Sequence, residues 1–273
     1  MKIALSVAAF PTNFGPMMYS GENLTELEVI FRKIKGFGYD GMDLFLNNKT
    51  PSECGEIKAL LDRYELEVSM AIFIYLFELG VNLSHRDNQV RAKAVKTYIG
   101  EIEKAHILGA RTVPLGFIRG KRDADDSYDD YCERLAESTR QVSRAALDKG
   151  IRLCIEPINR YEVNTMLSVA ETLRFLEKYH LDETWLLPDL FHMNIEDAQM
   201  GEALQMAGTR IGHLHVPDSN RRMPGLGHID YQEVMDALNA AGYDGYLSAE
   251  AMCGDCVDQE AEDGIQYLRS LMV

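Results

Sequence analysis

The chain has 273 residues, of which 46% are hydrophobic, enough to bury a large core. Its formal net charge of −15 argues against a nucleic-acid partner, because binding phosphates requires a basic surface. No apolar run reaches the roughly 18 residues of a membrane-spanning helix, and an odd number of cysteines, five, in a long chain favours the cytoplasm.

Strand-like and helix-like segments alternate from end to end, which is typical of a parallel sheet with crossover helices. The predicted strands cover residues 2–10, 40–46, 66–76, 111–118, 152–157, 184–190, 211–217 and 245–250. The predicted helices cover residues 23–38, 52–65, 86–109, 131–150, 168–180, 202–208, 230–242 and 258–272. We therefore expect an α/β fold, a (β/α)₈ TIM barrel in which residues 1–273 form a single domain.

Glycine marks the end of several predicted helices. We expect the first helix to begin at a cap on Asn23 or Thr25 and to stop at Gly36. Before later strands, a glycine able to adopt a left-handed conformation ends the preceding helix; these residues are Gly38, Gly109, Gly150 and Gly242.

Four candidate metal ligands end successive apolar runs: Glu156, Asp189, His215 and Glu250. They lie 33, 26 and 35 residues apart, close to the roughly 30 residues that a barrel uses per strand–helix unit. Barrel chemistry is found at the C-terminal ends of the strands. Three carboxylates and one imidazole suit one divalent ion such as Mn²⁺, Mg²⁺ or Co²⁺ better than a thiolate-rich zinc site does.

Two of these residues, Glu156 and Glu250, come from the fifth and eighth predicted strands, across the barrel mouth. A substrate carbon held between them would face a carboxylate on either side. One glutamate can then remove a proton from one face while the other returns a proton to the opposite face, which is how an epimerase works. The enediolate-like intermediate would be stabilised by the metal ion.

The strings EPINRYE, DLFHMNIED and HLHVPDSNRRMPGLGHIDY resemble those of the sugar isomerase/epimerase superfamily with a xylose-isomerase-like barrel, and most of all its ketose 3-epimerases. The resemblance implies a free ketose inverted at C3, and one Mn²⁺ (or Co²⁺) ion per subunit on Glu156, Asp189, His215 and Glu250. It also implies that Glu162, His192 and Arg221 hold the sugar. We further expect a homo-oligomer, a dimer or tetramer.

The sequence departs from the ketose 3-epimerase pattern in two places. After Glu250 it runs EAMCGDC where a Glu-Pro-Phe-like string is usual, and the first strand lacks the expected aromatic pair. Phe10 and Phe14 are candidates for that pair, and Phe73 and Tyr75 for apolar contacts to the sugar.

Alternatives of other kinds stay open. An aldose–ketose or hydroxypyruvate-type isomerase, or an isomerase or epimerase of sugar phosphates, would use the same metal and glutamates. A nuclease on the same barrel needs about three zinc ions and a larger ligand set, and a sugar- or metal-binding barrel without activity needs no proton relay. The pair Cys253 and Cys256 forms a CxxC without a second zinc half-site, so we expect two thiols on a loop near the metal.

Overall fold

The computed structural model describes residues 1–11, 19–252, 254 and 256–272. Eight parallel strands curl into one sheet in the order β7-β6-β5-β4-β3-β1-β9-β8, and the short β2 pairs with β1. Bridges between Leu186 and Ile211 and between Asp189 and His215 join the two edges and close the barrel. The strands are β1 (Lys2–Ala8), β2 (Tyr19–Ser20), β3 (Gly41–Phe45), β4 (Glu67–Ile72), β5 (Thr112–Leu115), β6 (Arg152–Ile155), β7 (Thr184–Leu186), β8 (Leu214–His215) and β9 (Tyr246–Ala249).

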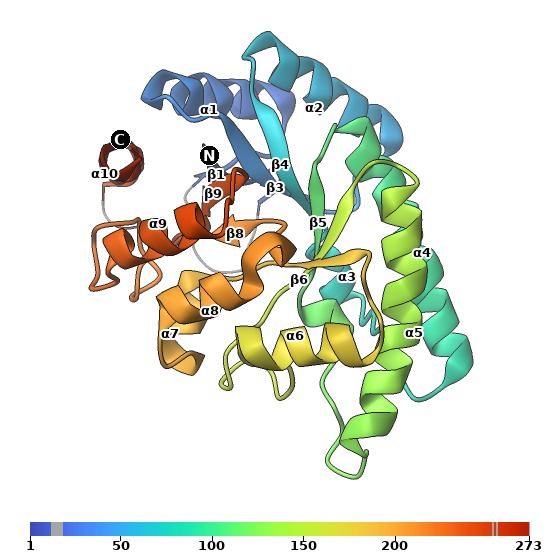
Figure 1. Cartoon of the computed structure of the whole chain (residues 1–273). Helices are drawn as coiled ribbons and strands as arrows, with labels where there is room; N and C mark the ends of the chain where they lie inside the picture. The colour runs from blue at the N-terminus through green and yellow to red at the C-terminus, as the bar shows by residue number, and fades with distance from the viewer. Residues whose placement is uncertain (12–18, 253, 255, 273) are drawn as a thin grey trace.

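The helices form the outer layer around the strands (Figure 1). The last helix packs against the first, since the hydroxyl of Tyr39 donates to the carbonyl of Ala261 and Lys33 pairs with Asp258. The α-helices are α1 (Leu24–Phe37), α2 (Pro51–Arg63), α3 (Tyr75–Glu78), α4 (Asn88–Ile107), α5 (Tyr128–Leu147), α6 (Val169–Lys178), α7 (Leu190–Glu196), α8 (Met200–Ala207), α9 (Tyr231–Ala240) and α10 (Val257–Leu271). The described residues also form two 3₁₀ turns, η1 (Phe117–Arg119) and η2 (Gly208–Arg210). The predicted TIM barrel is confirmed.

Side-chain caps fix where most helices begin. Asn23 accepts hydrogen bonds from the first-turn amides of α1, and Thr50 and Glu53 cap α2 reciprocally. The glycines predicted to end helices, Gly38, Gly109, Gly150 and Gly242, all have positive φ.

Several local predictions were wrong, among them the strands predicted over 184–190 and 211–217, which end at Leu186 and His215. α1 runs through Gly36 and stops at Gly38, because only Gly38 adopts the left-handed conformation that turns the chain. β4 ends at Ile72, and Tyr75–Glu78 is the short helix α3. β5 likewise ends at Leu115. The helix α7 and the strand β2 were missed.

The core has two parts. The larger fills the space between sheet and helices, and a smaller cluster fills the barrel interior with residues including Phe45, Met70, Ile72 and Leu187. Each fully buried Leu-sized side chain contributes about 1.5–3 kcal/mol, so the strands are held firmly and their ends are fixed in space. None of the described helices is both long and apolar enough to cross a membrane.

Candidate active site

The four predicted ligands converge at the C-terminal mouth of the barrel. Nδ1 of His215 lies 3.7 Å from Oε1 of Glu156, 3.6 Å from Oδ2 of Asp189 and 3.6 Å from Oε2 of Glu250. All four ligand atoms lie within 4.8 Å of one another. An octahedral ion at about 2.1 Å from its ligands separates them by about 3.0–4.2 Å, so the spacing fits one divalent cation.

Local structure explains how each side chain is aimed. Glu156 follows β6 and Glu250 follows β9, while His215 ends β8 and forms a bridge with Asp189. Asp189 is also the cap of α7: its Oδ1 accepts from the amide of Phe191 at 2.8 Å, which leaves Oδ2 to face the other ligands.

Two buried atoms at this centre lack any hydrogen-bond partner: Oδ2 of Asp189 and Nδ1 of His215. Burial by itself would lower the pKa of His215, but Glu250, Asp189 and the neighbouring carboxylates outweigh it and hold that pKa well above its usual value. Burial raises the pKa of Glu250 in spite of His215 and Arg221. Buried lone-pair atoms without a hydrogen-bond partner, surrounded by carboxylates, are the mark of a cation site.

The predicted sugar-holding residues surround this centre. His192 is 2% exposed, with Nε2 3.9 Å from Oε1 of Glu156 and Nδ1 4.0 Å from Oε1 of Glu162. Nη1 of Arg221 lies 4.0 Å from the same oxygen of Glu162. The fold therefore brings all seven predicted site residues together.

Arg221 is held in a demanding conformation. Its φ of 60° is unusual for a residue with a side chain, and backbone hydrogen bonds to Asp218 and Met252 fix it. Its Nη2 donates to Oε2 of Glu250 at 2.6 Å, and its guanidinium lies over the ring of Phe191. Burial opposes the charge, yet Glu250 and the other carboxylates raise the pKa of Arg221, so it stays a cation.

An apolar wall borders the centre. One pocket is lined by Glu156, His215 and Glu250 together with a hydrophobic group: Phe45, Ile72, Phe73, Ile74, Phe77, Tyr98, Pro114, Gly116, Phe117 and Ile118. A Cβ at Gly116 would lie 2.9 Å from Oε2 of Glu156 and would push that carboxylate out of its position. The wall contains Phe73, as predicted, whereas Tyr75 is directed to Lys104 and does not line the pocket.

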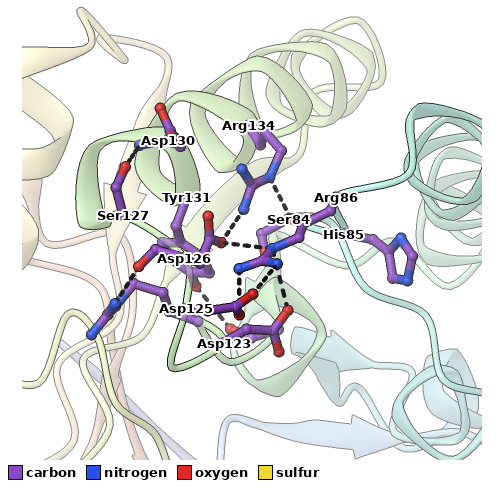
Figure 2. A network of polar contacts seen from close by, with 12 residues as sticks. Ser84, His85, Arg86, Asp123, Asp125, Asp126, Ser127, Asp130, Tyr131 and Arg134 are labelled. Atoms are coloured by element: carbon purple, nitrogen blue, oxygen red, sulfur yellow. Dashed lines mark hydrogen bonds and ion pairs between the residues drawn. The ribbon is translucent and has the colours of Figure 1, made fainter.

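The two loops that carry this wall are clamped together at the surface (Figure 2). Arg86, before α4, donates to both carboxylate oxygens of Asp125, at 3.0 and 2.7 Å. Arg134 of α5 pairs with the buried Asp126 and donates to the carbonyl of Ser84. Exposed pairs such as Arg86–Asp125 contribute little each, but the network joins the loop after β4 to the loop after β5.

Sequence reasoning missed three buried polar residues at this centre. Asp43 contacts His215 from below, Arg119 donates to the backbone carbonyls of Glu156 and Thr165, and Asn159 donates to His192 (2.7 Å) and Glu162 (2.9 Å). A charge within the apolar run GMDLF was the one signal for Asp43. Arg119 ends the short turn η1 and Asn159 lies in a loop, so no hydrophobic periodicity in the sequence points to either residue.

Among the cysteines, Cys54, Cys132 and Cys154 are buried free thiols and Cys256 is an exposed free thiol just before α10. Cys253 and Phe14 lie outside the described residues. Phe10 belongs to the small interior cluster and does not line the pocket beside the glutamates.

Fold and site together define a TIM barrel with a carboxylate–imidazole centre at the C-terminal ends of its strands. TIM-barrel enzymes have their active sites at this end of the barrel. The sequence profile of the xylose isomerase-like TIM barrel matches residues 31–271. The chain belongs to this family, as the resemblance predicted.

Relatives with a named activity are epimerases of sugars. The L-ribulose 3-epimerase of Mesorhizobium japonicum is 30% identical over 90% of this chain and 82% of its own length. The 3-dehydro-D-guloside 4-epimerase of Escherichia coli is 26% identical over 91% of this chain and 95% of its own. A solved L-ribulose 3-epimerase superposes with a TM-score of 0.84 over 99% of this chain and 94% of its own, at 23% identity. The prediction of an isomerase of the ketose 3-epimerase type agrees with the relatives.

Proposed function

We propose that the chain is a metal-dependent epimerase of a free ketose that inverts C3 with Glu156 and Glu250. The observation that carries the proposal is the convergence of four donor side chains on one point, with Oδ2 of Asp189 and Nδ1 of His215 unpartnered. The named relatives support the reaction class.

Glu156, Asp189, His215 and Glu250 would hold the ion. Three carboxylates and one imidazole favour Mn²⁺, with Co²⁺ or Mg²⁺ as the alternatives. When bound, a divalent ion supplies Lewis acidity, which makes a proton on the carbon next to a ketone easier to remove.

The proton is moved by the glutamates. β6 and β9, which precede Glu156 and Glu250, are separated in the ring by β7 and β8, so the two carboxylates approach the pocket from well-separated sides. Each has two oxygens, and one can face the ion while the other faces the substrate. Removal of the C3 proton by one glutamate and delivery of a proton to the opposite face by the other inverts that carbon.

The sugar is held by the remaining residues. Asn159 donates to Nδ1 of His192, which keeps the ring's other nitrogen as the N–H that faces the site. Glu162 accepts from a sugar hydroxyl and Arg221 donates to a sugar oxygen. This assignment rests on their positions around Glu156 and Glu250.

The apolar wall favours a free sugar over a phosphate ester. Among the described residues that line the apolar pocket there is no Lys or Arg, and Arg221 of the site is already paired with Glu250 at 2.6 Å. Burying a phosphate without a cation of its own is costly. We expect kcat/KM for a free ketose to exceed that for its 6-phosphate by about 100-fold. A preference for the phosphate ester that disappears in Arg221→Ala would contradict the choice of a free sugar and leave the metal centre standing.

One observation favours a second candidate. The relative that acts as a 4-epimerase aligns with nearly its whole length. Epimerisation at C4 beside a C3 ketone requires the same removal and return of a proton α to a carbonyl. The site chemistry therefore suits both reactions, and the position of the ketone in the substrate distinguishes them.

Deuterium exchange tests the proposal. The Mn²⁺-loaded protein is incubated in D₂O with D-fructose, D-tagatose, D-psicose, L-ribulose and a 3-keto-glycoside, and NMR locates the deuterium. Label at C3 with the inverted ketose as product is the expected result. Label at C1 or C2 with an aldose product would indicate an aldose–ketose isomerase, and label at C4 the second candidate. No exchange on any sugar would contradict both epimerase candidates. The homo-oligomer stays a prediction, which sedimentation analysis would test.

A further inference from the structure

Asp43 is a carboxylate sealed inside the barrel directly beneath the proposed metal centre. It lies on β3, is 0% exposed, and has no role in the chemistry derived above. Its Oδ2 is 3.0 Å from Nε2 of His213 and 3.1 Å from Nε2 of His215. Its Oδ1 accepts from the hydroxyl of Ser69 at 2.5 Å.

These contacts fix the tautomer of His215. An ionised carboxylate only accepts hydrogen bonds. Asp43 is arranged as such an acceptor, because its Oδ1 accepts from Ser69 and its Oδ2 lies within 3.1 Å of two imidazole nitrogens. His213 and His215 must therefore both present Nε2–H to Oδ2. A neutral imidazole with its proton on Nε2 carries its lone pair on Nδ1.

In His215, Nδ1 is the atom that faces Glu156, Asp189 and Glu250 and lacks any other partner. We propose that Asp43 is a positioning residue: it holds His215 in the Nε2–H tautomer and orientation that offer Nδ1 to a divalent ion. This inference rests on the proposed metal centre. It predicts that Asp43 raises the affinity for the ion although Asp43 does not itself bind the ion.

Ser69 and His213 hold Asp43 in turn. They occupy two further acceptor sites of its carboxylate, and the ring of His213 stands edge-on to that of His215, with centroids 5.4 Å apart at 89°. Asp43, His213 and His215 are close enough to resemble a second ion site. However, the 3.0 and 3.1 Å between Oδ2 of Asp43 and the two Nε2 atoms are hydrogen-bond distances. An N–H on each histidine accounts for both contacts.

The experiment measures Mn²⁺ affinity by calorimetry in wild type, Asp43→Asn and Ser69→Ala. Outer partners of a ligand histidine are typically worth about 10–100-fold in metal affinity, so Asp43→Asn is expected to weaken binding by that factor at a stoichiometry of one ion. Ser69→Ala removes one hydrogen bond and should weaken binding about two- to tenfold. Asp126→Asn, which alters another buried ion-paired carboxylate away from the centre, is the matched control and should bind Mn²⁺ as wild type does.

A spectroscopic measurement separates positioning from general loss of structure. ¹⁵N NMR of the histidine rings in the wild-type protein loaded with diamagnetic Mg²⁺ should report an N–H on Nε2 of both His213 and His215, and no proton on Nδ1 of His215. This measurement needs no variant, so it decides the inference even where Asp43→Asn does not fold.

The outcomes distinguish the inference from the proposed function. If wild type binds no divalent ion, the metal centre itself is wrong. If wild type binds one ion but Asp43→Asn binds it within twofold, or if His215 carries its proton on Nδ1, the inference fails while the metal centre stands. A second ion that is lost in Asp43→Asn would overturn the inference in favour of a separate metal site.

Discussion

Glutamine at position 156 or 250 is expected to lower kcat by about 10²–10⁴-fold, the usual worth of a general base. Gln keeps the size and one oxygen donor of each glutamate but cannot accept the proton. Weaker ion binding adds to the loss, so each variant is assayed at saturating Mn²⁺ with its metal content measured by elemental analysis.

The two variants should also differ from each other. With one glutamate left, epimerisation stops, but the remaining carboxylate can still exchange the proton of the epimer that it faces. Glu156→Gln is therefore expected to exchange deuterium into one C3 epimer and Glu250→Gln into the other. Glu162→Gln is the matched control, since it should raise KM and leave both exchange reactions working. Near-wild-type turnover in either metal-loaded variant at position 156 or 250 would exclude a proton role for that residue.

Removal of divalent ions by chelation is expected to abolish activity, and Mn²⁺ or Co²⁺ to restore it. The same ion should stabilise the fold, because an ion present at 100 times its Kd contributes about 2.7 kcal/mol to the free energy of unfolding. A thermal melt with and without Mn²⁺ measures this. Full activity after exhaustive dialysis against EDTA, with no metal found by elemental analysis, would contradict a metal-dependent mechanism.

Metal binding should also depend on pH. The ion needs the unprotonated Nδ1 of His215, and the surrounding carboxylates, led by Glu250, raise the pKa of this histidine in the metal-free protein in spite of its burial. Protons therefore compete with the ion, and affinity is expected to rise as pH rises from 6 to 8. Titrations with Mn²⁺ at several pH values test the sign, and an affinity that falls over that range would contradict it.

Local sequence predicted most elements but not all of their ends. The run IFIYL reads as a strand because a short apolar run fits a buried strand and a buried helix equally well; the structure turns it into α3 after Ile72. Likewise α7 begins directly after Asp189, whose side chain caps it. The sequence pattern singled out Asp189 as a candidate metal ligand and gave no sign that it also caps a helix.

The barrel and its four converging metal-ligand candidates could be predicted from the sequence alone. Parallel strands of a closed sheet all end at one mouth, so polar residues that follow buried runs at the period of the barrel must meet there. The residues that surround them could be found only in the folded structure. Asp43 is separated from His213 and His215 by 170 and 172 residues along the chain, and the apolar wall is assembled from loops after different strands. Such contacts depend on which strands are neighbours and how their side chains pack in the interior, and neither is encoded in a local pattern.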